Sequence, residues 1–167
     1  DDLTLAFAWA DMIAASRDAS LLEQIDVAFP SARAFALLEI AQFDAAWTEA
    51  EKINDPYERA RAQAEIVSRW GDAEFAQKIQ IPVYRDLAMR NVSIKQRDVS
   101  LAKKIENVYY KVQALTALDE TASAVELAQA LNDKYPLVQL VERLASQDVQ
   151  AALPLVELPQ KVYQDFI

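Results

Sequence analysis

The sequence predicts an all-α protein in which about six short helix-turn-helix units stack into a right-handed α-α superhelix, a solenoid. Two observations support this prediction. Apolar residues recur at intervals close to 26 residues along most of the chain. Each interval holds two stretches whose apolar residues lie three or four positions apart, which is typical of two short helices. We expect a single helical-repeat domain, 1–167, with an N-terminal helix at 3–15 and repeats at 16–167, the last of them a degenerate cap.

Columns of equivalent residues keep one register over about a hundred residues, which is hard to obtain by chance. The first column is separated by 28, 26, 26 and 26 residues: Ile25, Ile53, Ile79, Ile105 and Leu131. Two others keep the same steps: Leu38, Ile66, Val92, Leu118 and Leu144, and Phe29, Tyr57, Val83, Tyr109 and Tyr135. A column of small residues predicts where helix backbones approach closely: Ala34, Ala62, Ala88 and Ala114. The unit 43–70 has two extra residues, and the spacing of the residues around them places both in the first helix of that unit.

The first expected element is the apolar segment LTLAFAWADMIAAS, residues 3–16. Phe7, Trp9, Met12 and Ile13 cannot all point inward on a terminal helix. The segment is therefore either a cap folded over the first unit or a cut end that once met another part of a longer chain.

Residues that start and stop helices lie at the boundaries of the following units. Gly71 and Asp72 fit a helix stop followed by an N-cap, and Asp98 fits an N-cap in the next unit. Pro56 and Pro82, which are 26 apart, suit the first turn of a second helix, because that position needs no backbone N–H. Helices of about eight to twelve residues are marginal alone in water, so neighbouring units must stack.

The last unit loses this pattern. Pro154 and Pro159 interrupt it, and an apolar tail follows. A decayed final repeat is the usual way in which a stack of repeats is capped.

With two short helices in each unit, the chain resembles the broad class of α-solenoid repeats, such as the tetratricopeptide, Sel1 and HEAT families. The resemblance covers residues 16–167 and concerns architecture rather than a sequence signature. The tetratricopeptide repeat has a period of 34 and a W-x₂-L-G-x₂-Y opening, and neither occurs here. Such families mostly act as scaffolds that bind proteins or peptides, and the resemblance implies the same role for this chain.

Composition removes several classes of function. The 167 residues include no cysteine, no histidine and one glycine, so a Gly-rich phosphate loop, a Cys/His zinc site and a Ser-His-Asp triad are excluded. We expect no metal and no cofactor. A formal net charge of −9 argues against nucleic acid as a partner, and no apolar run is long enough to cross a bilayer. The cytoplasm is the favoured compartment, although a chain that opens at Asp1 leaves a removed signal peptide open.

One column of the pattern is basic. Arg59, Arg85 and Lys111 are 26 apart, in the first turn of successive second helices. Stacking would align them as a positive stripe that could bind an acidic peptide or another partner bearing carboxylates. The alternative is that they pair with acids of the adjacent unit. We favour this alternative, because features kept in every unit usually serve packing.

Two tyrosines are the other candidates for binding. Tyr84 and Tyr110 are 26 apart, and their equivalents in other units are proline or glutamate, so they lie outside the core columns. Such variable positions are better candidates for an interaction surface. Tyr57 and Tyr109, by contrast, fall in a regular column that we interpret as packing, and Trp47 also falls in a core column.

We therefore expect a non-catalytic scaffold that binds a protein or a peptide, with no nucleic acid and no membrane span. The first alternative is a structural spacer within a larger protein. Self-association through the apolar N-terminal helix would favour this alternative. The second is a glycan hydrolase that would use a carboxyl group, such as Glu39 or Glu142, held protonated in an apolar cleft.

Overall fold

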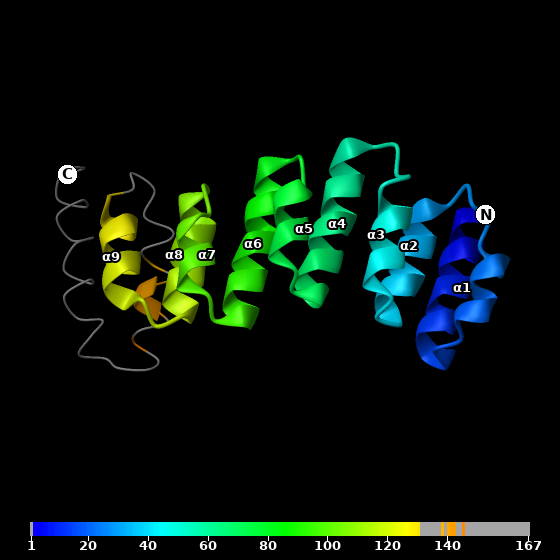
Figure 1. Ribbon diagram of the computed structural model, residues 1–167, viewed down its shortest axis with the longest axis horizontal. Helices are drawn as coiled ribbons and strands as arrows, with labels where there is room; N and C mark the ends of the chain where they lie inside the picture. Colours follow the sequence, from blue (N-terminus) through cyan, green and yellow to red (C-terminus); the bar gives the residue numbers. More distant parts are fainter. Residues whose placement is uncertain (1, 131–137, 139, 143–144, 146–167) are drawn as a thin grey trace, which may run out of the picture. The chain divides into compact units, whose positions relative to one another are not determined.

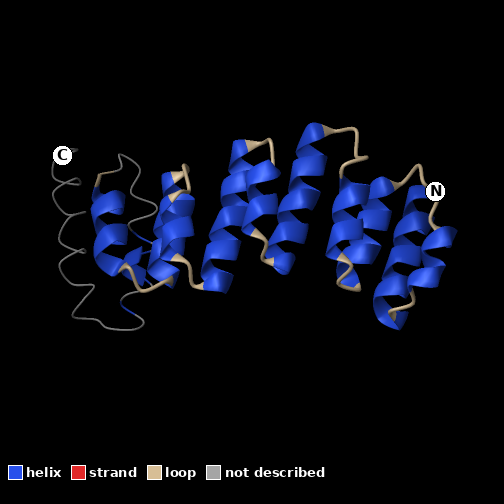
Figure 2. Cartoon of the chain, in the orientation of Figure 1, coloured by secondary structure: helices blue, strands red, loops and turns tan. Residues whose placement is uncertain are grey.

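A computed structural model of the chain describes residues 2–130, 138, 140–142 and 145. These residues form helices joined by short loops, with no strand among them, as Figure 2 shows. The prediction of an all-α protein is therefore confirmed. In order, the elements are α1 (Asp2–Ser16), the 3₁₀ helix η1 (Ala19–Gln24), α2 (Pro30–Glu39), α3 (Phe43–Ala50), α4 (Pro56–Trp70), α5 (Ala73–Lys78), α6 (Pro82–Gln96), α7 (Val99–Lys103), α8 (Val108–Ala117) and α9 (Thr121–Gln129).

The chain divides into two compact units, residues 1–96 and 97–167. The first unit contains α1 to α6, in which helices that follow one another in the sequence pack side by side (Figure 1). In the second unit, α7 and α9 both pack against α8. The single domain expected from the sequence stays a prediction.

The predicted helix boundaries are confirmed where N-caps and glycine mark them. The Asp72 carboxylate accepts hydrogen bonds from the backbone N–H groups of Glu74 and Phe75, at 2.8 and 3.2 Å, and so caps α5. Asp98 caps α7 in the same way through the N–H of Leu101, at 3.0 Å. Gly71 ends α4 with a φ of 89°, a left-handed conformation that side chains with a Cβ rarely adopt.

The second helices of three successive hairpins begin 26 residues apart, at Pro30, Pro56 and Pro82. The buried isoleucines that precede the first two of these helices, Ile25 and Ile53, are 28 residues apart, as in the predicted column. As predicted, α3 is longer than α5, with eight residues against six. Four residues, 26–29, separate Ile25 from Pro30, whereas two residues, 54–55, separate Ile53 from Pro56, and this difference gives the second helices their 26-residue spacing.

The isoleucine column lies in the core of the described chain. Ile25, Ile53, Ile79 and Ile105 are between 0 and 5% exposed, and Trp47 is 5% exposed, as predicted. Within residues 1–96, one core joins α1, η1 and α2, and a second joins α2, α3 and α4. Each of these two cores therefore joins three consecutive elements.

The prediction that Tyr57 packs in the core is wrong, because this residue is 62% exposed. Tyr57 lies in the first turn of α4. Residues 54–58, at this end of the helix, are all exposed, so the Tyr57 side chain projects into solvent. Val83, the next residue of the same column, is 44% exposed for the same reason, since it follows Pro82 at the start of α6.

The N-terminal helix is confirmed as α1. Its apolar residues do not all point inward: Ile13 is fully buried, whereas Phe7 and Met12 are 39% and 51% exposed. Among the residues that the structure describes, no helix combines the length and the apolar character that crossing a membrane requires.

Candidate functional site

A groove of about 390 Å³ lies on the face of the 1–96 unit that α2, α4 and α6 form. Each helix contributes residues three, four or seven positions apart, which is the spacing of one helical face. From α2 these are Ser31, Ala34, Phe35 and Leu38; from α4, Glu58, Arg61, Ala62 and Glu65; and from α6, Tyr84, Leu87 and Asn91. The groove therefore changes from apolar on α2 to charged on α4 and mixed on α6.

Aromatic side chains line the groove on both sides of α4. Phe7 of α1 meets Phe35 of α2 with ring centroids 6.4 Å apart and planes tilted by 58°. Across α4, the half-buried ring of Tyr84 lies in the lining together with Leu87. Apolar and aromatic walls with a few polar groups are the usual composition of a ligand-binding groove.

The charged residues of the groove belong to α4. Arg61 Nη2 and Glu58 Oε2 are 2.5 Å apart, and both side chains are more than half exposed. An exposed pair of this kind contributes little to stability, about 0–1 kcal/mol, because water solvates both ions well. A charged group of a ligand can therefore replace either partner of this ion pair at little cost in free energy.

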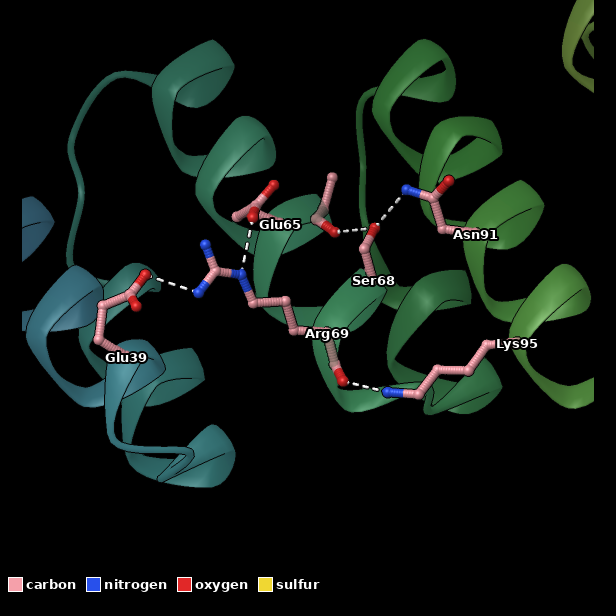
Figure 3. A network of polar contacts seen from close by, with 7 residues as sticks. Glu39, Glu65, Ser68, Arg69, Asn91 and Lys95 are labelled. Carbon is pink, nitrogen blue, oxygen red and sulfur yellow. Dashed lines mark hydrogen bonds and ion pairs between the residues drawn. The ribbon is translucent and has the colours of Figure 1, made fainter. Parts of the chain in front are cut away.

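A polar network runs across the three helices beside the groove (Figure 3). Arg69 of α4 reaches Glu39 of α2 at 2.6 Å and Glu65 of its own helix at 2.9 Å. The hydrogen bond with Glu39 raises the pKa of the Arg69 guanidinium above its ordinary value, so the group stays charged. The network connects α2 to α4 at the C-terminal ends of both helices.

The same network joins α4 to α6. Asn91 Nδ2 donates a hydrogen bond to Ser68 Oγ at 2.8 Å, and Ser68 in turn donates to the carbonyl of Ala64 at 2.6 Å (Figure 3). The ammonium group of Lys95 donates to the carbonyl of Arg69 in the last turn of α4. These contacts hold the three helices of the groove at fixed separations.

The predicted basic residues contact the protein itself in the 1–96 unit. Arg59 Nη1 donates to the carbonyl of Ile53 at 2.9 Å, and Arg85 Nε lies 3.9 Å from Asp86 Oδ1. Neither contact is the expected pairing with an acid of the adjacent unit, because Ile53 lies in the same unit as Arg59 and Asp86 is the residue after Arg85. Lys111 is half-buried on α8 in the other unit.

Of the two candidate tyrosines, the structure places Tyr84 in the groove. Tyr110 lies on α8 in the other unit, where its ring centroid is 5.5 Å from that of Tyr109. Sequence analysis missed Phe35 and Asn91, which the groove needs, because nothing in the 26-residue pattern distinguishes a groove residue from any other surface residue.

Arg33 was also missed. It precedes Arg59 by 26 residues, which is a signal that the 28-residue step concealed. Its Nη1 donates to the carbonyls of Leu22 and Ile25, at 3.0 and 2.9 Å, and its Nε lies 3.3 Å from Glu49 Oε2. Arg33 and Arg59 thus bind the carbonyls that end the preceding short helical segments.

The glutamates considered for acid catalysis do not have apolar surroundings. Glu39 pairs with Arg69, and Glu142 is exposed. A carboxyl group stays protonated near neutral pH only when an apolar site or a second carboxylate disfavours its charge. Over the described stretches of the chain, acidic side chains form no group of three or more that could hold a metal ion.

Comparisons of the chain with protein-family models, with curated proteins and with solved structures found no match.

Proposed function

We propose that the chain is a non-catalytic scaffold of helical repeats that binds a segment of a partner protein in the groove over α2, α4 and α6. The groove carries this proposal, because aromatic residues from α1, α2 and α6 converge on it around an exposed ion pair. Interfaces commonly bind through such aromatic anchors with charged groups near them.

The repeat arrangement is part of the proposal. Its support is the 26-residue spacing of the prolines that begin α2, α4 and α6, together with the burial of the isoleucine column. In a right-handed stack, the second helices of successive hairpins would form one continuous face. The groove lies on the face of these helices, so a partner segment would cross several hairpins.

The surroundings of the glutamates support a role without catalysis. A glycan hydrolase needs one carboxyl group held protonated beside one that is ionised. Glu39 lies 2.6 Å from the guanidinium of Arg69 and Glu142 is exposed, so neither has the apolar cleft that the hydrolase alternative needs. The hydrolase alternative therefore has no candidate acid among the glutamates considered.

The test compares two tyrosines on neighbouring helices. A partner is first captured from lysate with the wild-type chain, and its dissociation constant is then measured by calorimetry. Tyr84→Ala should weaken binding at least about tenfold, because an aromatic anchor is lost from the groove. Tyr57→Ala is the matched control, since Tyr57 is exposed and does not line the groove.

Equal affinity of the wild type and the Tyr84→Ala variant would contradict the groove as the binding site. Thermal unfolding of both variants shows whether the fold is intact. Reversal of the Arg59 charge is a poorer test, because Arg59 donates to the Ile53 carbonyl and its loss would disturb the hairpin. If no partner is captured, the spacer alternative gains over the scaffold.

A further inference from the structure

Helix α1 carries two apolar stripes. One of them is covered, and in the other only Trp9 is half-buried, against the core of α1, η1 and α2. Ala6, Ala10 and Ile13 are at most 3% exposed and pack against η1 and α2. The second stripe has the spacing of one helical face and consists of Leu5, Ala8, Trp9 and Met12. Leu5 and Met12 are 58% and 51% exposed. A helix that is apolar on both sides is typically covered on both.

At three of the four positions of this second stripe, the equivalent residues of α4 and α6 are buried, except for Ala62, which is half-buried. Helices α1, α4 and α6 each have fifteen residues, and a step of 54 residues places the buried stripe of α1 on that of α4. The same step carries Ala8, Trp9 and Met12 to Ala62, Gln63 and Ile66, and a further 26 carries them to Ala88, Met89 and Val92. Gln63 and Ile66 are 7% and 1% exposed, and the three α6 residues are at most 4% exposed.

The structure also shows what covers these stripes. In α4, Ile66 and Ala62 share a core with Ala50 of α3 and with Ile53, which follows it. Helix α5 also packs on α6, beside which it lies in Figure 1, and carries Ala76, with Ile79 three residues later, both at most 1% exposed. A short helix with an alanine and an isoleucine three positions on therefore fits this kind of stripe.

We propose that the stripe of Leu5, Ala8, Trp9 and Met12 is a docking site for a short helix of a partner protein, with alanine and isoleucine at that spacing. This is a second binding surface beside the groove, and it rests on the repeat arrangement proposed above. Apolar burial supplies the attraction, and the small Ala8 permits a close approach of the two helices.

Charge indicates the other residues of the docked helix. Residues 1–32 hold six acidic residues and one basic residue, Arg17. A partner helix that carries lysines beside its apolar face therefore complements α1, whereas a second copy of α1 would bring two acidic surfaces together. Within this chain, residues 98–106 have the required composition, with Ala102, Ile105 and two lysines.

The experiment supplies such a helix on a tether. A copy of residues 98–106 is added before Asp1 of the full chain, so that two residues connect its isoleucine to α1, as 106–107 connect Ile105 to α8. The tether raises the effective concentration of the docked helix. We expect Tm to rise by about 4 °C, a typical effect of one added packing contact in a chain of this size. The indole N–H resonance of Trp9 should also move, while those of Trp47 and Trp70 stay in place.

Two controls isolate the stripe. Met12→Asp should abolish the gain in the extended chain but leave Tm almost unchanged in the original chain, because Met12 is half exposed there. An added segment with aspartate in place of both its alanine and its isoleucine should give no gain. Equal gains from both segments, or no gain from either, would overturn the proposal.

Sedimentation of the original chain decides between a partner helix and a second copy. A dimer that Met12→Asp converts into a monomer would overturn the proposal in favour of self-association. The groove is tested separately through Tyr84 of α6, so failure of the docking stripe and failure of the groove give different results.

Discussion

Arg33 shows how one buried cation can hold a loop of the fold. Its guanidinium donates to two carbonyls at the end of η1 and lies 3.3 Å from the carboxylate of Glu49, which Lys52 also contacts at 2.9 Å. Removal of one partner of such a group leaves the other charge buried without compensation, which is why buried ionic contacts are costly to break. Arg59 makes a contact of the same kind, since its guanidinium donates to the carbonyl of Ile53.

A titration tests the N-cap of α7. Asp98 Oδ1 accepts hydrogen bonds from Ser100 Oγ at 2.7 Å and from the backbone of Leu101, and the Ser100 hydroxyl is the main reason that the pKa of Asp98 is below its ordinary value of 3.8. A lowered folded-state pKa means that the cap stabilises above about pH 3.8 and that this contribution is lost as pH falls through the folded pKa. Ser100→Ala should therefore raise the pKa of Asp98 toward 3.8, as measured by carboxyl NMR.

Asp18 provides the matched control for this titration. It caps η1, and its pKa is lowered mainly through the side chain of Ser20. Ser20→Ala should raise the pKa of Asp18 and leave that of Asp98 unchanged. If Ser100→Ala did not move the midpoint of Asp98, the hydroxyl would not be the cause of its low pKa.

At the scale of elements, the short helices depend on close backbone approach. Ala114 of α8 is fully buried, so a larger side chain there must displace its neighbours. We expect Ala114→Leu to destabilise the fold by about 1–3 kcal/mol and to lower Tm accordingly. Ala8→Leu is the control, because Ala8 is exposed on α1. An unchanged Tm for Ala114→Leu would show that the small column does not mark a helix contact.

Much of the secondary structure could be predicted, because it depends on local signals. Asp72, Asp98, Gly71 and the prolines act through bonds or backbone angles within a few residues of themselves. The 26-residue step from the start of α2 to the start of α4 could not be predicted, because the stretch from Ile25 to Pro30 is two residues longer than the stretch from Ile53 to Pro56. The apolar columns do not show where within a unit such a difference lies.

The candidate site could be predicted only in part. Tyr84, which lines the groove, was identified as a candidate because the residue at its position differs between units while the core columns stay apolar. Phe35 and Asn91 lie in the same groove but have no such mark, since a groove arises from the side-by-side packing of helices that are distant in sequence. Tyr57 was misassigned because a residue in the first turn of a helix can keep the spacing of a core column and still project into solvent.

At the scale of the whole molecule, the 1–96 unit contains its own cores and the polar network of its groove. The core of α1, η1 and α2 and the core of α2, α3 and α4 both lie within it. In a stack of repeats, the free energy of unfolding is a sum of contributions from single units and from contacts between neighbours. Removal of one unit therefore lowers it only by the contribution of that unit and its contacts. In a domain with one central core, the same removal destroys the fold.

Two shortened chains distinguish these cases. Residues 1–96 should fold alone, with a cooperative loss of helical circular dichroism on heating. Residues 1–71 keep Gly71 and both cores but uncover Ala60, Ala64 and Val67 of α4, which are at most 2% exposed. If the hairpins form a stack, residues 1–71 should still unfold cooperatively, at a lower temperature than residues 1–96. If residues 1–71 show no unfolding transition while residues 1–96 do, then α5 and α6 complete a single indivisible core, and the repeat arrangement is wrong.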